Sequence, residues 1–336
     1  MKKDANAPSP RKFPLYVIVS LDVEEEGLFS GRYSAAGGVH NVALLPRLAP
    51  LTRELGFPLT LFCAYTVFDN PEARRVLAFM RDKCGAEIAA HLHHWSTPPL
   101  RENTVETGQP DRTHRMDRDL LRQCLKSLLT AGRQFQSMPL TSFRMGRWDM
   151  KSELRPLLQE AGITLDSSVC PLRAFRDGAD HFLAPADPYW YGGLDSRQDI
   201  RLLESPVTQV ALAPTVARLW HKCVHSSAPL DSFHFWSAVS ANPVWHSARM
   251  MRFATRLHLF RGGRVLHLFW HSSEMLPGAS PNVPDKSASR ALFKKIYSFL
   301  QWLEENFFIR AVTAAQLRDA AGDLHFPERP TGKGDW

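Results

Sequence analysis

The sequence predicts an α/β protein built on a parallel β-sheet. Short apolar runs rich in β-branched residues alternate with longer helical segments, which is the order that a parallel sheet requires. The first run, residues 15–21, is apolar without interruption, as is typical of a strand buried on both faces. Polar residues also fall at or just after the C-terminal ends of five predicted strands: Asp22, His91, Arg144, Asp166 and His271. In parallel barrels this end of the strands forms the active site, so the five residues are candidates for one site.

The predicted elements follow in a regular order. Residues 1–12 are polar and contain proline, so we expect disorder there. Strands are predicted at 15–21, 59–64, 86–92, 140–144, 163–166, 202–204, 207–211, 264–270 and near 309–313. Helices are predicted at 42–55, 71–83, 115–135, 151–161 and 288–306, with Gly56, Gly85 and Gly162 after three of them. A polar loop at 98–110 is long enough to be functional.

The chain is basic, with a formal net charge of +7 and a pI near 9.3, which favours an anionic partner. Much of the excess lies between Arg218 and Arg264, where basic residues alternate with Trp and Phe. We predict a helical insertion at about 214–262. It would be either an ordinary subdomain with its aromatic residues in the core, or a surface for nucleic acid or membrane. No recognised nucleic-acid-binding motif accompanies the charge, so no nucleic-acid partner is expected.

We expect the chain to remain inside the cell. No window approaches the roughly 20 apolar residues of a membrane span, and residues 1–14 are basic without an apolar run. The expectation is a cytoplasmic protein, with peripheral contact at the inner membrane surface as an option. Neither a disulfide framework nor a thiolate zinc site is expected, because five scattered cysteines form no C-x-x-C pair: Cys63, Cys84, Cys124, Cys170 and Cys223.

Three imidazoles fall within four residues at His91, His93 and His94. Imidazole is the commonest neutral nitrogen ligand for divalent transition metals. In a strand, His91 and His93 would project to the same face and His94 to the other, whereas a loop could turn any two of them inward. The cluster is a candidate metal site, with an ordinary buried histidine network as the alternative.

Five short motifs resemble, in order, those of the polysaccharide deacetylases of carbohydrate esterase family 4, the NodB-homology family. They span roughly residues 15–275 and are Ser20-Leu21-Asp22-Val23-Glu24, Ala90-His91-Leu92-His93-His94, Phe143-Arg144-Met145-Gly146-Arg147-Trp148, Asp166-Ser167-Ser168-Val169 and Leu268-Phe269-Trp270-His271-Ser272. The resemblance implies a deformed (β/α) barrel of about seven parallel strands with the helical insertion. It would form a single domain over 13–320, followed by a tail at 321–336.

The resemblance also implies roles for the acids after the first strand. Two acids spaced i, i+2 at a strand end can enter one cleft, one to bind a cation and one to take a proton from water. By the family pattern Asp22 would be the general base and Glu24 a metal ligand. The family usually has aspartate where Glu24 stands, and Glu25 and Glu26 leave the ligand open.

The family spaces its two histidine ligands four residues apart, and the residue four after His91 is Trp95. The second ligand would therefore be His93, with His94 as the substitute. Three protein ligands with an open position suit zinc. A chain without the second ligand would be a metal-free, glycan-binding pseudoenzyme on the same fold, which is the alternative function.

The remaining motifs complete an expected hydrolase that removes an N-acyl group, N-acetyl by expectation, from an amino sugar. Arg144 would orient Asp22, and His271 would protonate the leaving amine while Asp166 holds its imidazole. The expected substrate contacts are Arg147, Trp148, Trp95 and Trp270. For the tryptophans the reason is that sugar rings present apolar faces to aromatic side chains. With no recognised signal peptide, the expected substrate is a lipid- or nucleotide-linked glycan precursor in the cytoplasm, whose phosphate would meet the positive charge.

Overall fold

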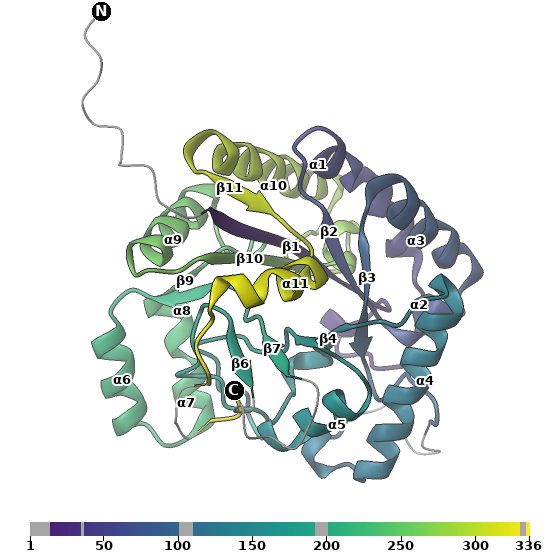
Figure 1. The fold of residues 1–336 in the computed structure, drawn as a ribbon, viewed down its shortest axis with the longest axis horizontal. Coiled ribbons are helices and arrows are strands. Elements are labelled where there is room, and N and C mark those ends of the chain that lie inside the picture. Colours follow the sequence, from purple (N-terminus) through teal and green to yellow (C-terminus); the bar gives the residue numbers. More distant parts are fainter. Residues whose placement is uncertain (1–13, 35–36, 101–109, 192–200, 330–333) are drawn as a thin grey trace, which may run out of the picture.

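The computed structural model describes residues 14–34, 37–100, 110–191, 201–329 and 334–336, which fold around one curled sheet (Figure 1). Its strand order is β10 (Val265–His271), β1 (Leu15–Val23), β2 (Leu59–Cys63), β3 (Glu87–Leu92), β4 (Ser142–Met145), β5 (Leu165–Asp166), β7 (Leu202–Glu204) and β6 (Tyr189–Tyr191), and β11 (Ile309–Ala311) also pairs with β1. The pairing of β6 with β7 is antiparallel, and the other pairings in this sheet are parallel. The sheet forms a half-barrel, so the predicted deformed barrel is confirmed.

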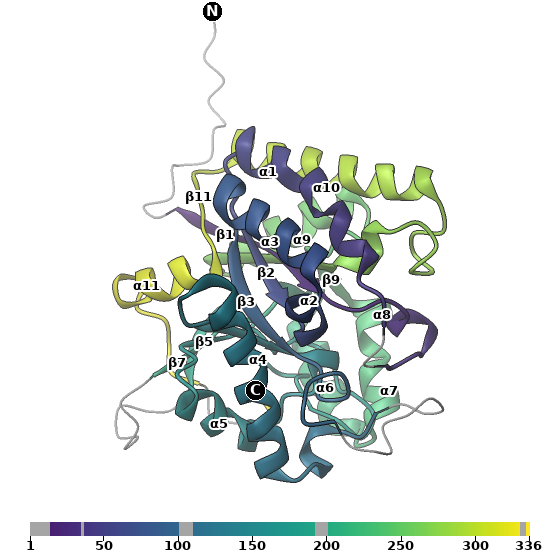
Figure 2. The same cartoon turned by 90° about the vertical axis from the view of Figure 1, so that its right-hand side faces the viewer.

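Helices cover the outer face of this half-barrel. They include α2 (Tyr65–Asp69), α3 (Pro71–Cys84), α4 (Arg118–Gln136), α5 (Arg155–Glu160) and α10 (Lys286–Asn306). Helix α3 begins where the side chain of Asn70 accepts hydrogen bonds from two backbone N–H groups, and it ends at Gly85 in the left-handed conformation. Helix α11 (Ala314–Leu324) instead packs on the inner face, and Figure 2 shows it at the side from which β1 starts.

The inner face of β1 is apolar at one end of the strand and polar at the other, because its alternate residues face inward. Val17, Val19 and Leu21 belong to the core under the outer helices, whereas Tyr16 and Ile18 belong to the core under α11. The next residues on the inner face are Ser20 and Asp22. The inner face is therefore apolar near α11 and polar toward the C-terminal ends of the strands.

The predicted helical insertion is present and contains a small second sheet. Strand β8 (Gln209–Ala211) pairs antiparallel with β9 (Ala238–Ser240). Around this pair lie α6 (Pro214–Cys223), α7 (Ser227–Asp231), α8 (Phe233–Ser237) and α9 (Ala248–Phe260). Figure 1 shows these helices together along one edge of the molecule.

Two element predictions are wrong. The helix expected at 42–55 is a 3-10 helix (His40–Leu48) followed by the short helix α1 (Ala49–Arg53), because Pro46 and Pro50 lack backbone donors. The tail expected from 321 overlaps α11, and Trp336 at the chain end is buried against Tyr189. Residues 1–12 and most of the loop at 98–110 lie outside the described residues.

Candidate active site

The polar inner half of the sheet brings together four of the predicted site residues. Asp22 is in register with His271 on β10, and His91 is in register with Arg144 on β4. Residues paired in register on neighbouring strands point to the same face of a sheet. The Asp22 carboxylate also lies 2.5 Å from Nη1 of Arg144 and 3.7 Å from Nε2 of His271.

A cluster of possible metal ligands lies beside this group. Glu24, His91 and His93 each offer one ligand atom, and these atoms lie within 4.8 Å of one another. Oε2 of Glu24 is 3.5 Å from Nε2 of both histidines, and the three side chains are at most 4% exposed. One carboxylate and two imidazoles are a ligand set of catalytic zinc sites, where a fourth position stays open.

The hydrogen bonds made by Nδ1 of each imidazole show whether Nε2 is available to bind a cation. Nδ1 of His91 donates to the carbonyl oxygen of Arg144 at 3.0 Å, and Nδ1 of His93 donates to Glu25 at 2.9 Å. Each Nε2 then carries a lone pair directed toward Glu24. Nε2 of His91 is buried without a hydrogen-bond partner, which is costly unless a ligand takes that lone pair. The residues fit a divalent ion held by Glu24, His91 and His93.

Glu25 is a supporting residue that the sequence left among open alternatives. Its side chain is fully buried, and Oε1 accepts hydrogen bonds from His93, from Trp95 Nε1 at 3.0 Å and from Ser96 Oγ at 3.0 Å. Burial opposes the charged form, but the interaction with His93 and the hydrogen bonds of the other donors lower the pKa of Glu25 to about 2. An ionised Glu25 fixes the tautomer and orientation of His93.

Gly146 leaves the space that His93 occupies. A Cβ at this position would lie 2.2 Å from Cδ2 of His93 and 2.8 Å from the carbonyl oxygen of Leu92. We expect Gly146→Ala to displace His93 and to weaken metal binding about 10- to 100-fold, as measured by competition with a chelator. The control is Gly322→Ala on α11, where the added methyl group meets nothing within 4 Å. Equal metal affinity in the two variants would contradict the assignment of His93 as a ligand.

Arg144 holds Asp22 in the charged form. The guanidinium is fully buried, and besides Asp22 it donates to the carbonyl oxygen of Ser167 at 3.0 Å and to Ser167 Oγ at 2.9 Å. Burial raises the pKa of Asp22, but nearby positive charge, that of Arg144 above all, outweighs it, so the pKa lies below its ordinary value. An ionised Asp22 beside the metal cluster can accept a proton.

His271 is held in the opposite, protonated state. Its Nδ1 lies 3.0 Å from Glu274 Oε2, and its Nε2 faces Asp22. Burial lowers the pKa of His271, but the charges of Glu24, Glu274 and Asp22 raise it to about 10. Its side chain is 19% exposed, more than the metal cluster, so His271 can reach a bound molecule. Glu274 was missed from the sequence, where nothing distinguishes it from other acids.

The prediction that Asp166 holds His271 is wrong. Asp166 is in register with Phe143, which packs in the core under the outer helices, so it points away from the site. Its Oδ2 lies 3.4 Å from Nε of the fully buried Arg155, which is also 3.3 Å from Glu204. The three residues form a buried ion cluster behind the sheet.

The expected aromatic substrate contacts need correction. Trp270 is fully buried in the outer core because it alternates with His271 along β10, so it cannot contact a substrate. Trp95 is 3% exposed and stacks on His93 with ring centroids 4.3 Å apart, which supports the metal ligand. The exposed ring beside His271 is Phe29, at 5.1 Å and 37% exposed.

Arg147 and Trp148 stay predicted substrate contacts. Trp148 is 8% exposed and packs edge-on against Phe269, near Arg144. Both Arg147 and Trp148 have left-handed backbone conformations, with φ of 57° and 56°. Such conformations are strained for residues other than glycine and are often found at functional sites.

His94 lies outside the metal cluster. Its Nε2 is 2.9 Å from the carbonyl oxygen of Asp111, and burial lowers its pKa to about 4. His94, the substitute ligand in the sequence prediction, is therefore directed toward Asp111 and not toward Glu24.

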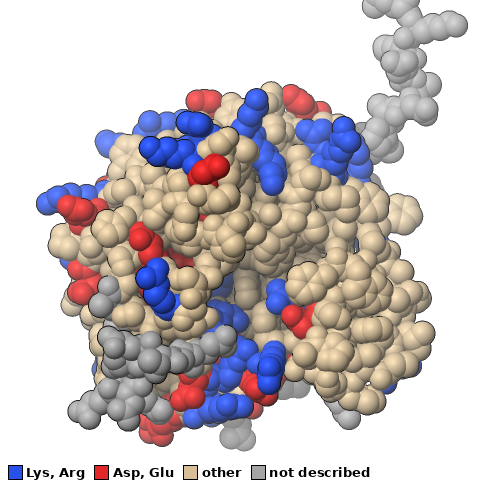
Figure 3. Space-filling view, turned by 180° about the vertical axis from the view of Figure 1, so that it is seen from behind, with Lys and Arg blue, Asp and Glu red and all other residues tan. Residues whose placement is uncertain are grey.

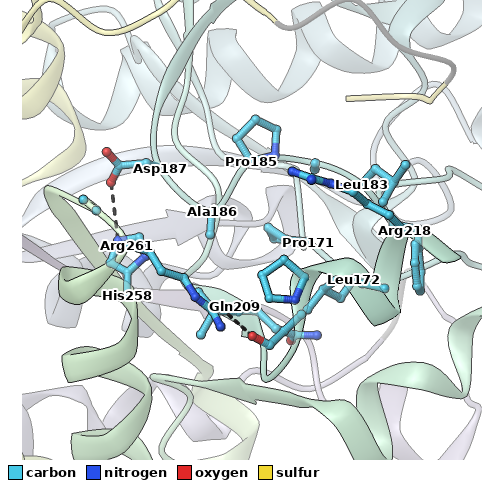
Figure 4. Close-up of a pocket in the computed structure, with 18 residues that line it drawn as sticks. Pro171, Leu172, Leu183, Pro185, Ala186, Asp187, Gln209, Arg218, His258 and Arg261 are labelled. Atoms are coloured by element: carbon cyan, nitrogen blue, oxygen red, sulfur yellow. Dashed lines mark hydrogen bonds and ion pairs between the residues drawn. The ribbon is translucent and has the colours of Figure 1, made fainter. Parts of the chain in front are cut away.

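A separate pocket of about 360 Å³ lies between the insertion and residues 171–187 (Figure 4). Two of its basic side chains make internal contacts: Nε2 of His258 is 2.9 Å from the carbonyl oxygen of Val265 and 3.4 Å from Asp187, and Arg261 donates to the carbonyl oxygen of Leu212. None of the predicted site residues lines it. We therefore assign the chemistry to the polar half of the main sheet.

Solved structures with the same fold are known. A protein of Mycobacterium smegmatis assigned as a polysaccharide deacetylase is 19% identical over 97% of each chain, with a TM-score of 0.54. A second such protein, from Pseudomonas aeruginosa PAO1, is 15% identical over 92% of this chain and 91% of its own, with a TM-score of 0.56. The chain has the polysaccharide-deacetylase fold.

The polysaccharide-deacetylase fold also occurs in Puue allantoinase, which is 14% identical over 96% of this chain and 95% of its own, with a TM-score of 0.59. No protein-family model matches the sequence, and a comparison with curated protein sequences finds no match. The function therefore has to be argued from the site.

Proposed function

We propose that the protein is a metal-dependent hydrolase that removes an N-acyl group, N-acetyl in the simplest case, from an amino sugar. The observation that carries this proposal is one arrangement on a deacetylase fold: Glu24, His91 and His93 face one another, with Asp22 and His271 beside them. A candidate base and a candidate acid with pKa values shifted in opposite directions are typical of acid–base hydrolysis.

The side chains divide the work of amide hydrolysis among them. When bound, a divalent ion would polarise the acyl carbonyl, and two imidazoles with a carboxylate favour zinc. Asp22, kept ionised by Arg144, takes a proton from the attacking water. His271, kept protonated by Glu274, donates a proton to the departing nitrogen. The products are a carboxylic acid and a free amine.

Metal removal tests the proposal. We expect the purified protein to contain about one equivalent of zinc and to release acetate from N-acetyl amino sugars. Dialysis against a chelator should abolish acetate release, because polarisation of the carbonyl is lost, and added Zn²⁺ should restore it. Acetate release that survives complete metal removal would contradict the proposal. Glycan binding without metal or acetate release would support the alternative pseudoenzyme.

We also propose that the surface of α6–α9 contacts an anionic membrane. Nine of the fourteen exposed large hydrophobic side chains among the described residues lie between 212 and 260, including Phe235 at 81% and Phe260 at 87% exposure. Residues 212–264 contain seven Lys and Arg and one acidic residue, so they carry +6 of the net charge of +7. The single acid, Asp231, is paired with Arg173 at 2.7 Å.

This combination of exposed aromatic rings and unopposed positive charge suits the interface of an anionic bilayer. In Figure 3, which views the side opposite to Figure 1, the lobe over α6 and α7 shows few charged side chains of either sign and borders a central hollow. No helix among the described residues is long and apolar enough to cross a membrane. Peripheral contact would bring a lipid-linked precursor to the site.

Vesicle binding tests this contact. We expect the protein to co-sediment with vesicles containing phosphatidylglycerol and to bind neutral phosphatidylcholine vesicles at least tenfold more weakly. Replacing Phe235 and Trp236 with serine should weaken the binding, because the apolar area that these exposed rings would bury in the membrane is lost. Phe308→Ser removes an exposed ring outside the insertion, at 68% exposure against 81% for Phe235 and 52% for Trp236, and serves as the control. Equal binding to both kinds of vesicle would overturn the proposed contact.

A further inference from the structure

A basic pocket lies beside the candidate active site. It has a volume of about 640 Å³ and is lined by four arginines and two aspartates: Arg112, Arg115, Arg147, Arg176, Asp111 and Asp177. Figure 3 shows Lys and Arg side chains gathered along the lower edge of the central hollow. The two acids do not balance the four guanidinium groups, so the pocket carries a net positive charge.

Arg147 connects this pocket to the candidate metal ligands. It follows Gly146, against which His93 packs, and its left-handed backbone turns the chain there. Its Nη1 donates to the carbonyl oxygen of Pro110 at 2.9 Å. The guanidinium carbon lies 5.3 Å above the Tyr33 ring, which packs edge-on against Trp95 beside His93.

Arg112 forms the fixed wall of the pocket. It is half-buried, lies 3.7 Å from the buried Asp149 and donates to the carbonyl oxygen of Arg176 at 2.6 Å. Asp149 in turn accepts a hydrogen bond from the backbone N–H of Thr113 at 2.7 Å. Burial lowers the pKa of Arg112, and the nearby charge of Arg147 adds to this effect against the opposing charge of Asp149.

The other two arginines lie at the solvent side. Arg115 is exposed, and Arg176 is paired loosely, at 4.0 Å, with the exposed Asp177. Exposed pairs of this kind contribute little stability, so these side chains can turn toward a ligand at small cost. Guanidinium groups on both a fixed and a movable side suit an anion with several oxygens.

We propose that this basic pocket binds a phosphate or diphosphate group of the substrate, so that the substrate is a phosphate-linked acyl amino sugar. This inference rests on the proposed hydrolysis at Glu24, His91 and His93, and names its substrate class. Arginine binds phosphate oxygens through paired hydrogen bonds, and a diphosphate offers two phosphoryl groups to the four guanidinium groups. A neutral polysaccharide offers no anionic oxygens to these guanidinium groups.

Titration with inorganic pyrophosphate tests the pocket separately from the reaction. We expect metal-stripped protein to bind pyrophosphate, and the double variant Arg115→Gln, Arg176→Gln to bind it at least tenfold more weakly. Arg290→Gln, an exposed arginine on α10, is the matched control and should bind as the unaltered protein does. Binding that is absent, or unchanged in the double variant, overturns the proposed pocket even if the protein releases acetate.

Substrate comparison then identifies the source of the phosphate. An N-acetyl sugar linked to a nucleoside diphosphate and the same sugar linked to a polyisoprenyl diphosphate are compared with the free sugar. We expect one linked form to be hydrolysed with at least tenfold higher kcat/KM, and the double arginine variant to lose that preference through KM. Equal kcat/KM for free and linked sugars would overturn the inference and leave the proposed deacylation intact.

Discussion

Replacing His91 with alanine is expected to remove both bound metal and acetate release. Nε2 of His91 is buried without a hydrogen-bond partner and faces Glu24, so its loss leaves two ligands where catalytic sites use three. We expect metal content to fall below a tenth of an equivalent and kcat/KM to fall by about 10³-fold or more, since activity depends on the ion. Metal analysis and an acetate assay on the same preparation measure the two effects together.

His94→Ala is the matched control for this variant. His94 lies three residues away, and its Nε2 is directed to the carbonyl oxygen of Asp111 rather than to Glu24. We expect it to retain its metal. A His91→Ala protein with full metal content, or a His94→Ala protein that lost it, would show that the ligand set is wrong.

Replacing His271 with alanine is expected to separate chemistry from metal binding. The imidazole lies at the edge of the site and is directed at Asp22 and Glu274, so its loss leaves the three candidate ligands in place. Loss of a general acid costs about 10²- to 10⁴-fold in kcat. We expect a decrease of this size with unchanged metal content. A variant with near-normal kcat would exclude His271 as the proton donor.

Glu274→Gln tests how His271 is kept protonated. The negative charge of Glu274 helps to raise the pKa of His271, so its removal should lower that pKa. The acid form of His271 would then be lost at a lower pH, and the alkaline limb of the kcat profile should shift toward acid. An unshifted limb together with a uniformly lower kcat would indicate that Glu274 acts on folding alone.

The arrangement of the site follows from the twofold alternation of side chains along strands. Asp22, His91 and Arg144 stand at positions of their strands that face inward. Their place at strand ends was therefore enough to predict that they lie close together. The same alternation puts Trp270 on the outer face because its neighbour His271 faces inward. The prediction for Asp166 was wrong for a related reason. The register of Asp166 with Phe143 directs its side chain to the outer face of the sheet, and this register cannot be predicted from one sequence.

Supporting contacts could be predicted less well than the strand residues. Glu25 and Glu274 lie after strands, where the backbone leaves the extended conformation and alternation no longer determines direction. Helix α11 was also missed, although its apolar face closes the inner core. Its residues follow the last predicted strand and extend past the predicted domain end at residue 320, and the need to cover the inner face appears only once the sheet has curled.

A crystal structure of the zinc-loaded protein, with anomalous data collected at the zinc edge, would show which side chains hold the ion. We predict one strong anomalous peak about 2.0–2.2 Å from a carboxylate oxygen of Glu24 and from Nε2 of His91 and His93. Zinc bound at any other group of residues, with these three side chains free of metal, would contradict it.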